Sequence, residues 1–196
     1  MKLKTFAACF GAYLAAVAVL FQFVYRPWQA TWGASEEEVI RPMVGDAVVK
    51  DPTFNATRAV TINATPEQIW PLIVQIGYRR AGFYSYDILD NDGIPSAEHI
   101  IPEYQNPMVG DQIPVDKKSV VYVAALEANR HLLLVFRSKV PATWAWGLYP
   151  VDAQRTRLVT RLRVEVRSVF GRVFLDAFEI IMMRKCMLGI KRRAER

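Results

Sequence analysis

Runs of alternating and helically spaced apolar residues predict an ordered series of strands and helices. The alternating, β-branched stretch 57–64 predicts a strand. Residues 65–68, Thr-Pro-Glu-Gln, then predict a helix start, because threonine can cap it, proline suits the first turn and glutamine completes a capping box. We expect this helix to end at Gly77 and a second, short helix to cover residues 84–90.

The middle of the chain alternates between short β-type runs and turn residues. We expect strands at residues 112–115, 119–126, 131–138 and 143–150. Residues 157–167 alternate strictly, with Arg161 and Arg163 on one face and Leu158 and Leu162 on the other. This pattern predicts a strand whose arginine-bearing face meets solvent.

Helical spacing returns at residues 168–190, which predicts a long C-terminal helix. One stripe of this helix is apolar and consists of Phe170, Phe174, Ala177, Phe178 and Ile181. The polar residues opposite are Arg172, Asp176 and Glu179. We expect the apolar stripe to pack into the core and the basic tail, residues 191–196, to fray.

An uncharged run of twenty residues, Thr5–Val24, precedes all these elements. At ~1.5 Å per helical residue it spans about 30 Å, the thickness of the hydrocarbon core of a bilayer. Residues of the types found at membrane interfaces flank it, namely Lys2, Lys4, Tyr25, Arg26 and Trp28. The apolar part of a cleaved signal peptide would be shorter, about 7–15 residues, so we interpret the run as an uncleaved, single-pass transmembrane anchor. The positive-inside rule then places the N-terminus in the cytoplasm and the main domain outside it.

Three small residues of this anchor, Ala7, Gly11 and Ala15, are spaced four apart. Such spacing can let two spanning helices approach closely, which would give a weak homodimer through the transmembrane helix. An alanine-rich span also produces the spacing by chance, so both interpretations stay open.

These patterns divide the chain into an anchor at 1–27, a connector at 28–54 and a folded domain at 55–196. The two tryptophans of the connector favour partial docking onto the domain, and Ser35 followed by three glutamates predicts a short helix. An apolar fraction of 52% excludes a disordered chain, and a count of two cysteines excludes a disulfide scaffold.

Residues 64–91, ATPEQIWPLIVQIGYRRAGFYSYDILDN, lie between the first strand and a VGDQIPV strand. With the long terminal helix, this series resembles the START-like, helix-grip superfamily (SRPBCC, polyketide-cyclase and lipid-transport type), including an uncharacterised subgroup of membrane-anchored members. The resemblance implies an α+β fold in which a curved antiparallel sheet wraps around the C-terminal helix. It also implies a cavity between sheet and helix that binds or carries a hydrophobic small molecule or lipid.

Aromatic and polar side chains on the expected walls of that cavity are the candidate ligand-binding residues. They are Trp70, Tyr84, Tyr86, Asp87, Tyr122, Phe136, Trp144, Trp146, Phe174 and Phe178. Core packing explains most of the aromatics equally well, and Asp87 could instead pair with Arg79 or Arg80. A cyclase or dehydratase using Tyr84, Tyr86 and Asp87 is the alternative hypothesis, and a structural partner of another membrane protein is the third. We favour a binding protein over an enzyme, because the residues do not suggest a persuasive catalytic dyad.

Metals and cofactors are not expected, because neither His99 nor His131 has another ligand at metal-binding spacing and no glycine-rich phosphate loop is present. Residues 153–196 carry 12 basic and 4 acidic side chains. This excess could hold the domain against anionic lipid headgroups or form a solvated sheet face. The arginines lack the interleaved aromatics of a single-strand binder, so we do not expect a nucleic-acid partner.

Overall fold

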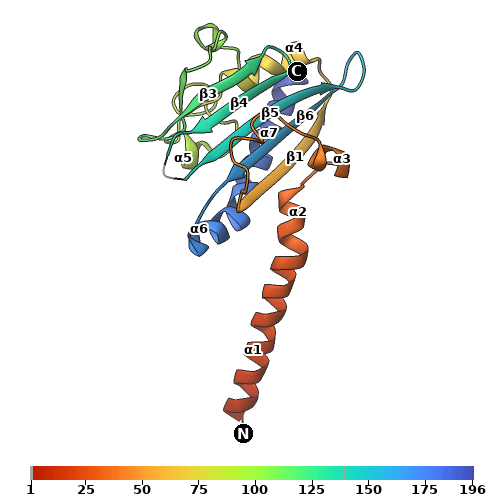
Figure 1. The fold of residues 1–196 in the computed structure, drawn as a ribbon, viewed down its shortest axis with the longest axis vertical. Coiled ribbons are helices and arrows are strands. Elements are labelled where there is room, and N and C mark those ends of the chain that lie inside the picture. Colours follow the sequence, from red (N-terminus) through yellow and green to blue (C-terminus); the bar gives the residue numbers. More distant parts are fainter. Residues whose placement is uncertain (1, 139) are drawn as a thin grey trace.

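The structure is a computed structural model that describes residues 2–138 and 140–196 and, within them, the side chains of Phe6 and of residues from Ala8 onward. One continuous helix begins the chain, made of α1 (Lys2–Leu20), a π-helical segment η1 (Phe21–Tyr25) and α2 (Arg26–Ala30). Its α1 part extends away from the rest of the molecule, whereas α2 lies against it (Figure 1). Within the described residues, this helix alone is long and apolar enough to cross a membrane.

Six antiparallel strands form one sheet in the order β1-β6-β5-β4-β3-β2. The strands are β1 (Phe54–Ile62), β2 (Gln112–Pro114), β3 (Val120–Glu127), β4 (His131–Phe136), β5 (Ala142–Pro150) and β6 (Thr156–Val164). Strands β2 to β6 form a meander, and β1 pairs with β6 from Phe54 opposite Val164 to Ile62 opposite Thr156. The strands that alternation predicted are therefore confirmed.

A second long helix crosses the inner face of the sheet and consists of α6 (Val169–Phe174), a π-helical segment η3 (Leu175–Glu179) and α7 (Ile180–Ala194). Helix α7 lies behind the sheet in Figure 1 and buries Met183, Cys186, Met187 and Ile190. The expected α+β architecture, a curved antiparallel sheet around a long C-terminal helix, is confirmed.

Helix α4 (Pro66–Val74) packs against α7 and begins with the predicted capping box. In that box Gln68 Oε1 accepts a hydrogen bond from the Thr65 amide at 2.9 Å. The helix ends short of the predicted Gly77, which instead forms a bridge with Gly82. Two short turns, α5 (Asp87–Asp90) and η2 (Pro102–Tyr104), follow before β2.

The connector lies across the outer face of the sheet. Its short helix α3 (Glu36–Ile40) begins at Ser35, as the sequence predicts. A capping box closes this end, in which Glu38 Oε2 accepts from the Ser35 amide at 2.8 Å. Further along, Met43 packs on Leu133 and Ala145 of the sheet. The outer face is thus covered by the chain itself.

Three arginines of β6 hold this connector. Arg157 pairs with Glu38 at 2.7 Å, and Arg163 Nη2 donates to the Val49 carbonyl at 2.8 Å. Arg161, between them, has a side chain that is only 4% exposed. The prediction of a solvated arginine face is therefore wrong, because planar guanidinium groups bind carboxylate and carbonyl groups of a segment distant in the sequence.

The first half of the C-terminal helix is oriented opposite to the prediction. Asp176 faces inward, with its Oδ2 2.8 Å from Arg26 Nε. Glu179 likewise forms an ion pair with the buried guanidinium group of Arg58. The apolar stripe on the other side is exposed, and Phe170 keeps 82% of its accessible surface. The stripe does not pack into the core here, because the two arginines require acidic partners on the inner side.

The basic tail is helical rather than frayed, which corrects a further prediction. Helix α7 continues to Ala194. Arg193 Nε donates to the Ala97 carbonyl and Lys191 Nζ donates to the Thr61 carbonyl, both at 2.8 Å. These contacts attach the end of the helix to β1 and to the loop before β2.

Candidate functional site

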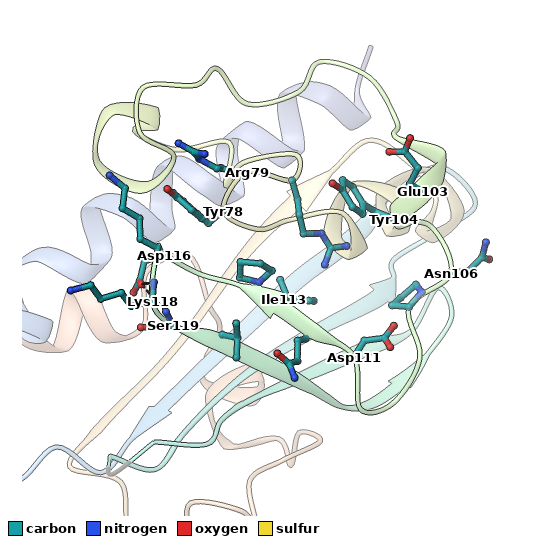
Figure 2. Close-up of a pocket in the computed structure, with 16 residues that line it drawn as sticks. Tyr78, Arg79, Glu103, Tyr104, Asn106, Asp111, Ile113, Asp116, Lys118 and Ser119 are labelled. Atoms are coloured by element: carbon teal, nitrogen blue, oxygen red, sulfur yellow. Dashed lines mark hydrogen bonds between the residues drawn. The ribbon is translucent and has the colours of Figure 1, made fainter.

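A polar groove of about 760 Å³ lies beside the edge strand β2 (Figure 2). Charged side chains of both signs line it, and many of them are already engaged. Lys117 pairs with Asp92 at 3.0 Å. Arg80 donates to the Val74 carbonyl at 3.0 Å and lies 4.3 Å from the centre of the Tyr104 ring. The groove therefore offers a mixed, largely neutralised surface rather than a site for one kind of ligand.

A smaller, open cavity of about 190 Å³ lies between the sheet and α7. Its walls are mostly apolar and consist of Phe83, Ser85, Asp90, Val115, Phe136, Trp144, Met182, Met183 and Cys186. Trp144 and Cys186 are buried, whereas Phe83, Phe136 and Met182 are half-buried. An apolar cavity with a few polar groups is the usual form of a small-molecule site.

Of these lining residues, only Asp90 carries a charge. Both oxygens of its carboxyl group are buried, and neither has a hydrogen-bond partner within residues 2–138 and 140–196. Burial, together with the charge of Asp87, raises the pKa of Asp90 to about 6, and the nearby Ser85 hydroxyl and the Tyr86 and Asp90 amides offset only part of this rise. Because a buried, unpaired carboxyl group costs stability, its presence marks a functional candidate.

The single turn of α5 places Asp90 in the cavity. Its neighbours Ile88 and Leu89 are 85% and 74% exposed, so this turn holds its acid inside and its aliphatic residues outside. Asn91 ends the turn and accepts a hydrogen bond from the Arg79 amide at 2.7 Å. These local contacts fix the direction of the Asp90 side chain.

The other polar groups of the cavity are Ser85 and Cys186. Ser85 Oγ donates to the Met182 carbonyl at 3.0 Å and so joins the segment before α5 to α7. Burial raises the pKa of the Cys186 thiol, which keeps it protonated near neutral pH. Among the described residues, no three His, Cys, Asp or Glu side chains group together as a metal site would require.

Two of the ten predicted ligand-binding residues, Phe136 and Trp144, line this cavity. The other predicted aromatics lie elsewhere: Trp70 and Trp146 in the core, Tyr122 beneath Arg137, and Phe174 and Phe178 on the exposed stripe of the C-terminal helix. The ring of Trp146 lies 5.0 Å from that of Trp144, so it supports the cavity wall from behind.

The predicted tyrosines occupy two different environments. Tyr84 is buried, and its hydroxyl accepts from Gln75 Nε2 at 2.8 Å and donates to the Leu72 carbonyl at 3.1 Å. Burial raises the pKa of Tyr84, so its phenol stays neutral. Tyr86 is partly exposed, and Lys185 Nζ lies 3.7 Å from the centre of its ring. Neither residue is among those that line the apolar cavity.

Asp87 lies outside the cavity and accepts a hydrogen bond from Ser96 Oγ at 2.5 Å. Within the described part of the chain it forms no ion pair with Arg79 or Arg80, so that alternative is wrong. Arg79 pairs with Asp92 at 3.2 Å instead.

Sequence reasoning singled out Asp87 and missed Asp90, three residues later. Their i, i+3 spacing places both on one side of a helical turn, so it could have brought Asp90 into consideration, but it could not show that only Asp90 reaches the cavity. The two aliphatic residues between them suggested the opposite orientation, because an apolar pair is normally buried.

Neither a protein-family model nor a curated protein matches the chain. Solved structures resemble it. An NMR structure from Thermobifida fusca aligns with a TM-score of 0.50 over 71% of this chain and 92% of its own, at 10% identity. A START superfamily protein from Mycobacterium smegmatis aligns with a TM-score of 0.47 over 72% and 97%, at 14% identity. The Aha1 dimer from Colwellia psychrerythraea aligns with a TM-score of 0.48 over 72% and 96%, at 15% identity.

The strand order and the long helix enclosed by the sheet describe the same fold as the alignment with the Thermobifida structure. The chain has a START-like helix-grip fold. At such low identity the likeness describes the fold alone, so the function of this helix-grip domain has to be derived from its own residues.

Proposed function

We propose that the protein is a membrane-anchored helix-grip domain that binds a small hydrophobic molecule bearing a hydrogen-bonding or cationic group. The observation that carries this proposal is the Asp90 carboxyl group, buried in an apolar cavity where neither oxygen forms a well-aligned hydrogen bond with the described residues. A ligand hydroxyl, amide or amine beside Asp90 would supply the missing hydrogen bond. Its apolar part would contact Phe83, Phe136 and Met182.

The size of the cavity limits the ligand. Typical small-molecule pockets measure about 300–1,000 Å³, whereas this cavity measures about 190 Å³. It therefore suits a small ligand, or the polar end of a longer ligand whose remainder extends out of the open cavity past the half-buried Phe83, Phe136 and Met182. A lipid held entirely inside would require α7 to move away from the sheet.

The membrane anchor is the N-terminal helix. Its segment Ala8–Ala30 meets the length and hydropathy of a membrane span, and its apolar part is not buried against the domain. The positive-inside rule supports a cytoplasmic N-terminus with the helix-grip domain on the other side. A weak homodimer through Gly11 and Ala15 stays a prediction, and the side chain of Ala7 lies outside the described ones.

The raised pKa of Asp90 also supports a second candidate, an acid–base enzyme of the cyclase or dehydratase type. Such chemistry requires further groups placed against the substrate. Ser85 already donates its hydroxyl to the Met182 carbonyl, and burial keeps the Cys186 thiol protonated. A binding function therefore has more support.

Hexylamine, hexanol and hexanoate are suitable probes, because they share a short chain and differ only in the polar group. Each would be added to the full chain in lipid nanodiscs at neutral pH, with thermal unfolding followed by near-ultraviolet circular dichroism. We expect hexylamine to raise the Tm most and hexanoate least, because Asp90 with a pKa of about 6 is mostly ionised there.

Two matched variants locate the effect. Asp90→Asn should abolish the preference for the amine, whereas Asp87→Asn removes the same charge outside the cavity and should keep it. If the three probes raised the Tm of Asp90→Asn in the same order as in the wild type, they would bind outside the cavity, for example in the bilayer, and the proposed site would be contradicted.

A further inference from the structure

An apolar stripe without a partner among the described residues runs along the first half of the C-terminal helix. It comprises the predicted Phe170, Phe174, Phe178 and Ile181 together with their neighbours Val169 and Val173, and each of these side chains is about half or more exposed. A contiguous apolar surface of this kind marks an interaction site on an otherwise folded domain. The inner side of the same helix carries Asp176 and Glu179, so a rotation that buried the stripe would expose two ion pairs and break their contacts.

The stripe lies beside the point where the N-terminal helix joins the domain. Tyr25 Oη donates to the Ala177 carbonyl at 2.8 Å, and Arg26 Nε lies 2.8 Å from Asp176 Oδ2. Both contacts join α2 and η1 to η3. Figure 1 shows α6 at the lower end of the domain, the end from which α1 extends. The stripe is therefore held near the level at which the anchor would leave a membrane.

This junction is built to be rigid. Arg58 of β1 is buried, pairs with Glu179 and donates to both the backbone and side-chain oxygens of Gln29 in α2, each at 2.7 Å. One guanidinium group thus connects the sheet, the N-terminal helix and the C-terminal helix. Because these three elements cannot shift independently, the depth of the stripe relative to the anchor is determined by the fold.

We propose that residues 169–181 lie in the interface of the bilayer that the anchor crosses, with the apolar stripe inserted at the boundary between headgroups and acyl chains. The inference rests on the proposed membrane anchor. An apolar face with charged flanks is typical of helices that lie in this interface. Arg167 and Arg172, at the start of the helix, are exposed and can reach anionic headgroups.

This placement brings the ligand cavity close to the bilayer. Met182 lines the cavity and follows Ala177, the contact of Tyr25, by about 8 Å along the helix axis at ~1.5 Å per residue. The exposed Ile88 and Leu89 lie on α5, and Ser85, just before α5, is bonded to Met182 in the same part of α7. An apolar molecule could then pass between bilayer and cavity over a short apolar path.

Spin labels on the full chain in vesicles of phosphatidylcholine and phosphatidylglycerol test the depth of the stripe. The native Cys9, exposed on α1, carries the label that reports on the anchor, while Cys186 is buried and stays unlabelled. In a Cys9→Ala background, Val173→Cys reports on the stripe. Val151→Cys is the matched control, because both valines are 50% exposed. Val151 precedes β6 and the stripe follows it, and the nine residues of β6 span about 30 Å at ~3.3 Å per residue.

Collisions with oxygen, which concentrates in the acyl region, are compared with collisions with a water-soluble nickel chelate. We expect the ratio of the two collision rates at Val173→Cys to exceed that at Val151→Cys severalfold and to approach the ratio at Cys9. Equal ratios at the two valine positions, with the Cys9 label in the hydrocarbon, would refute the contact of residues 169–181 with the bilayer but not the membrane anchor. A Cys9 label in water would overturn the anchor itself. Protection of Val173→Cys from both reagents would show that protein covers the stripe and would also overturn the proposal.

Discussion

Replacing Arg161 by methionine should release the connector from the outer face of the sheet. The guanidinium group donates to the carbonyls of Glu38, Val39 and Arg41 at 2.8–2.9 Å. It also pairs with the Asp46 carboxylate at 2.7 Å. Methionine fills a similar volume but donates no hydrogen bond, so these four acceptors would lose their common partner.

The size of the effect follows from these contacts. Breaking a buried ion pair costs about 3–5 kcal/mol, and a hydrogen bond to a charged group contributes about 1.5–3 kcal/mol. The contributions do not add fully here, because water can solvate the acceptors once the connector lifts, and Met43 still packs on the sheet. We expect the free energy that holds residues 36–50 against the sheet to fall by about 3 kcal/mol, roughly a 100-fold rise in the open population.

Hydrogen exchange of the full chain, followed by mass spectrometry, measures that population. Arg167→Met is the matched control, because the Arg167 side chain is 86% exposed and its loss should change stability by no more than about 0.5 kcal/mol. Arg161→Lys should fall between the two, since an ammonium group keeps the charge but not the planar set of donors. The reasoning is refuted if exchange over residues 36–50 is unchanged in Arg161→Met, or if it rises equally in Arg167→Met.

Three further predictions concern the cavity, the packing of α7 and the tail. Because burial raises the pKa of Asp90 from 3.8 to about 6, the folded state binds this proton more tightly than the unfolded chain, and its contribution to stability is lost as pH rises between these values. The Tm of Asp90→Asn relative to the wild type should therefore rise over that window, and thermal melts from acid to neutral pH check the sign. Gly189→Ala should destabilise the fold by about 1–3 kcal/mol despite the better helix propensity of alanine, because the new Cβ would lie 2.6 Å from that of Tyr84. Gly11→Ala places its Cβ in open space and should not destabilise the fold, so equal denaturation midpoints for the two variants would contradict this packing. Deleting residues 191–196 removes hydrogen bonds to Thr61, Asn63 and Ala97 and should lower the Tm by roughly 5–10 °C. An unchanged Tm would contradict the docking of the tail.

Local patterns identified the strands and helix starts because they depend on residues close in sequence. Alternation along residues 157–167 reports which side chains share a face, and this strand is β6. The N-cap at Ser35 and the capping box at Thr65 each involve residues within four positions, so they too could be found without tertiary information. Each of these predictions is confirmed.

The same patterns failed where a distant segment supplied the partner. The arginine face of β6 looks solvated until the connector, more than a hundred residues earlier, covers it. The C-terminal helix looks like a core helix until Arg26 and Arg58 bind its acidic side. The charge pattern along a helix does not show which side is buried when the apolar side can pack in the core and the acidic side can pair with buried arginines.

The candidate site shows the same division. The order of elements and the apolar span could be predicted from local patterns, as could the set of aromatic residues that includes the cavity walls Phe136 and Trp144. The inward direction of Asp90 and the outward direction of Ile88 and Leu89 depend on how the segments pack together. Secondary structure follows from interactions within a few residues, but the environment of a side chain depends on which distant surfaces meet it, and burial, pKa and ligand access all follow from that meeting.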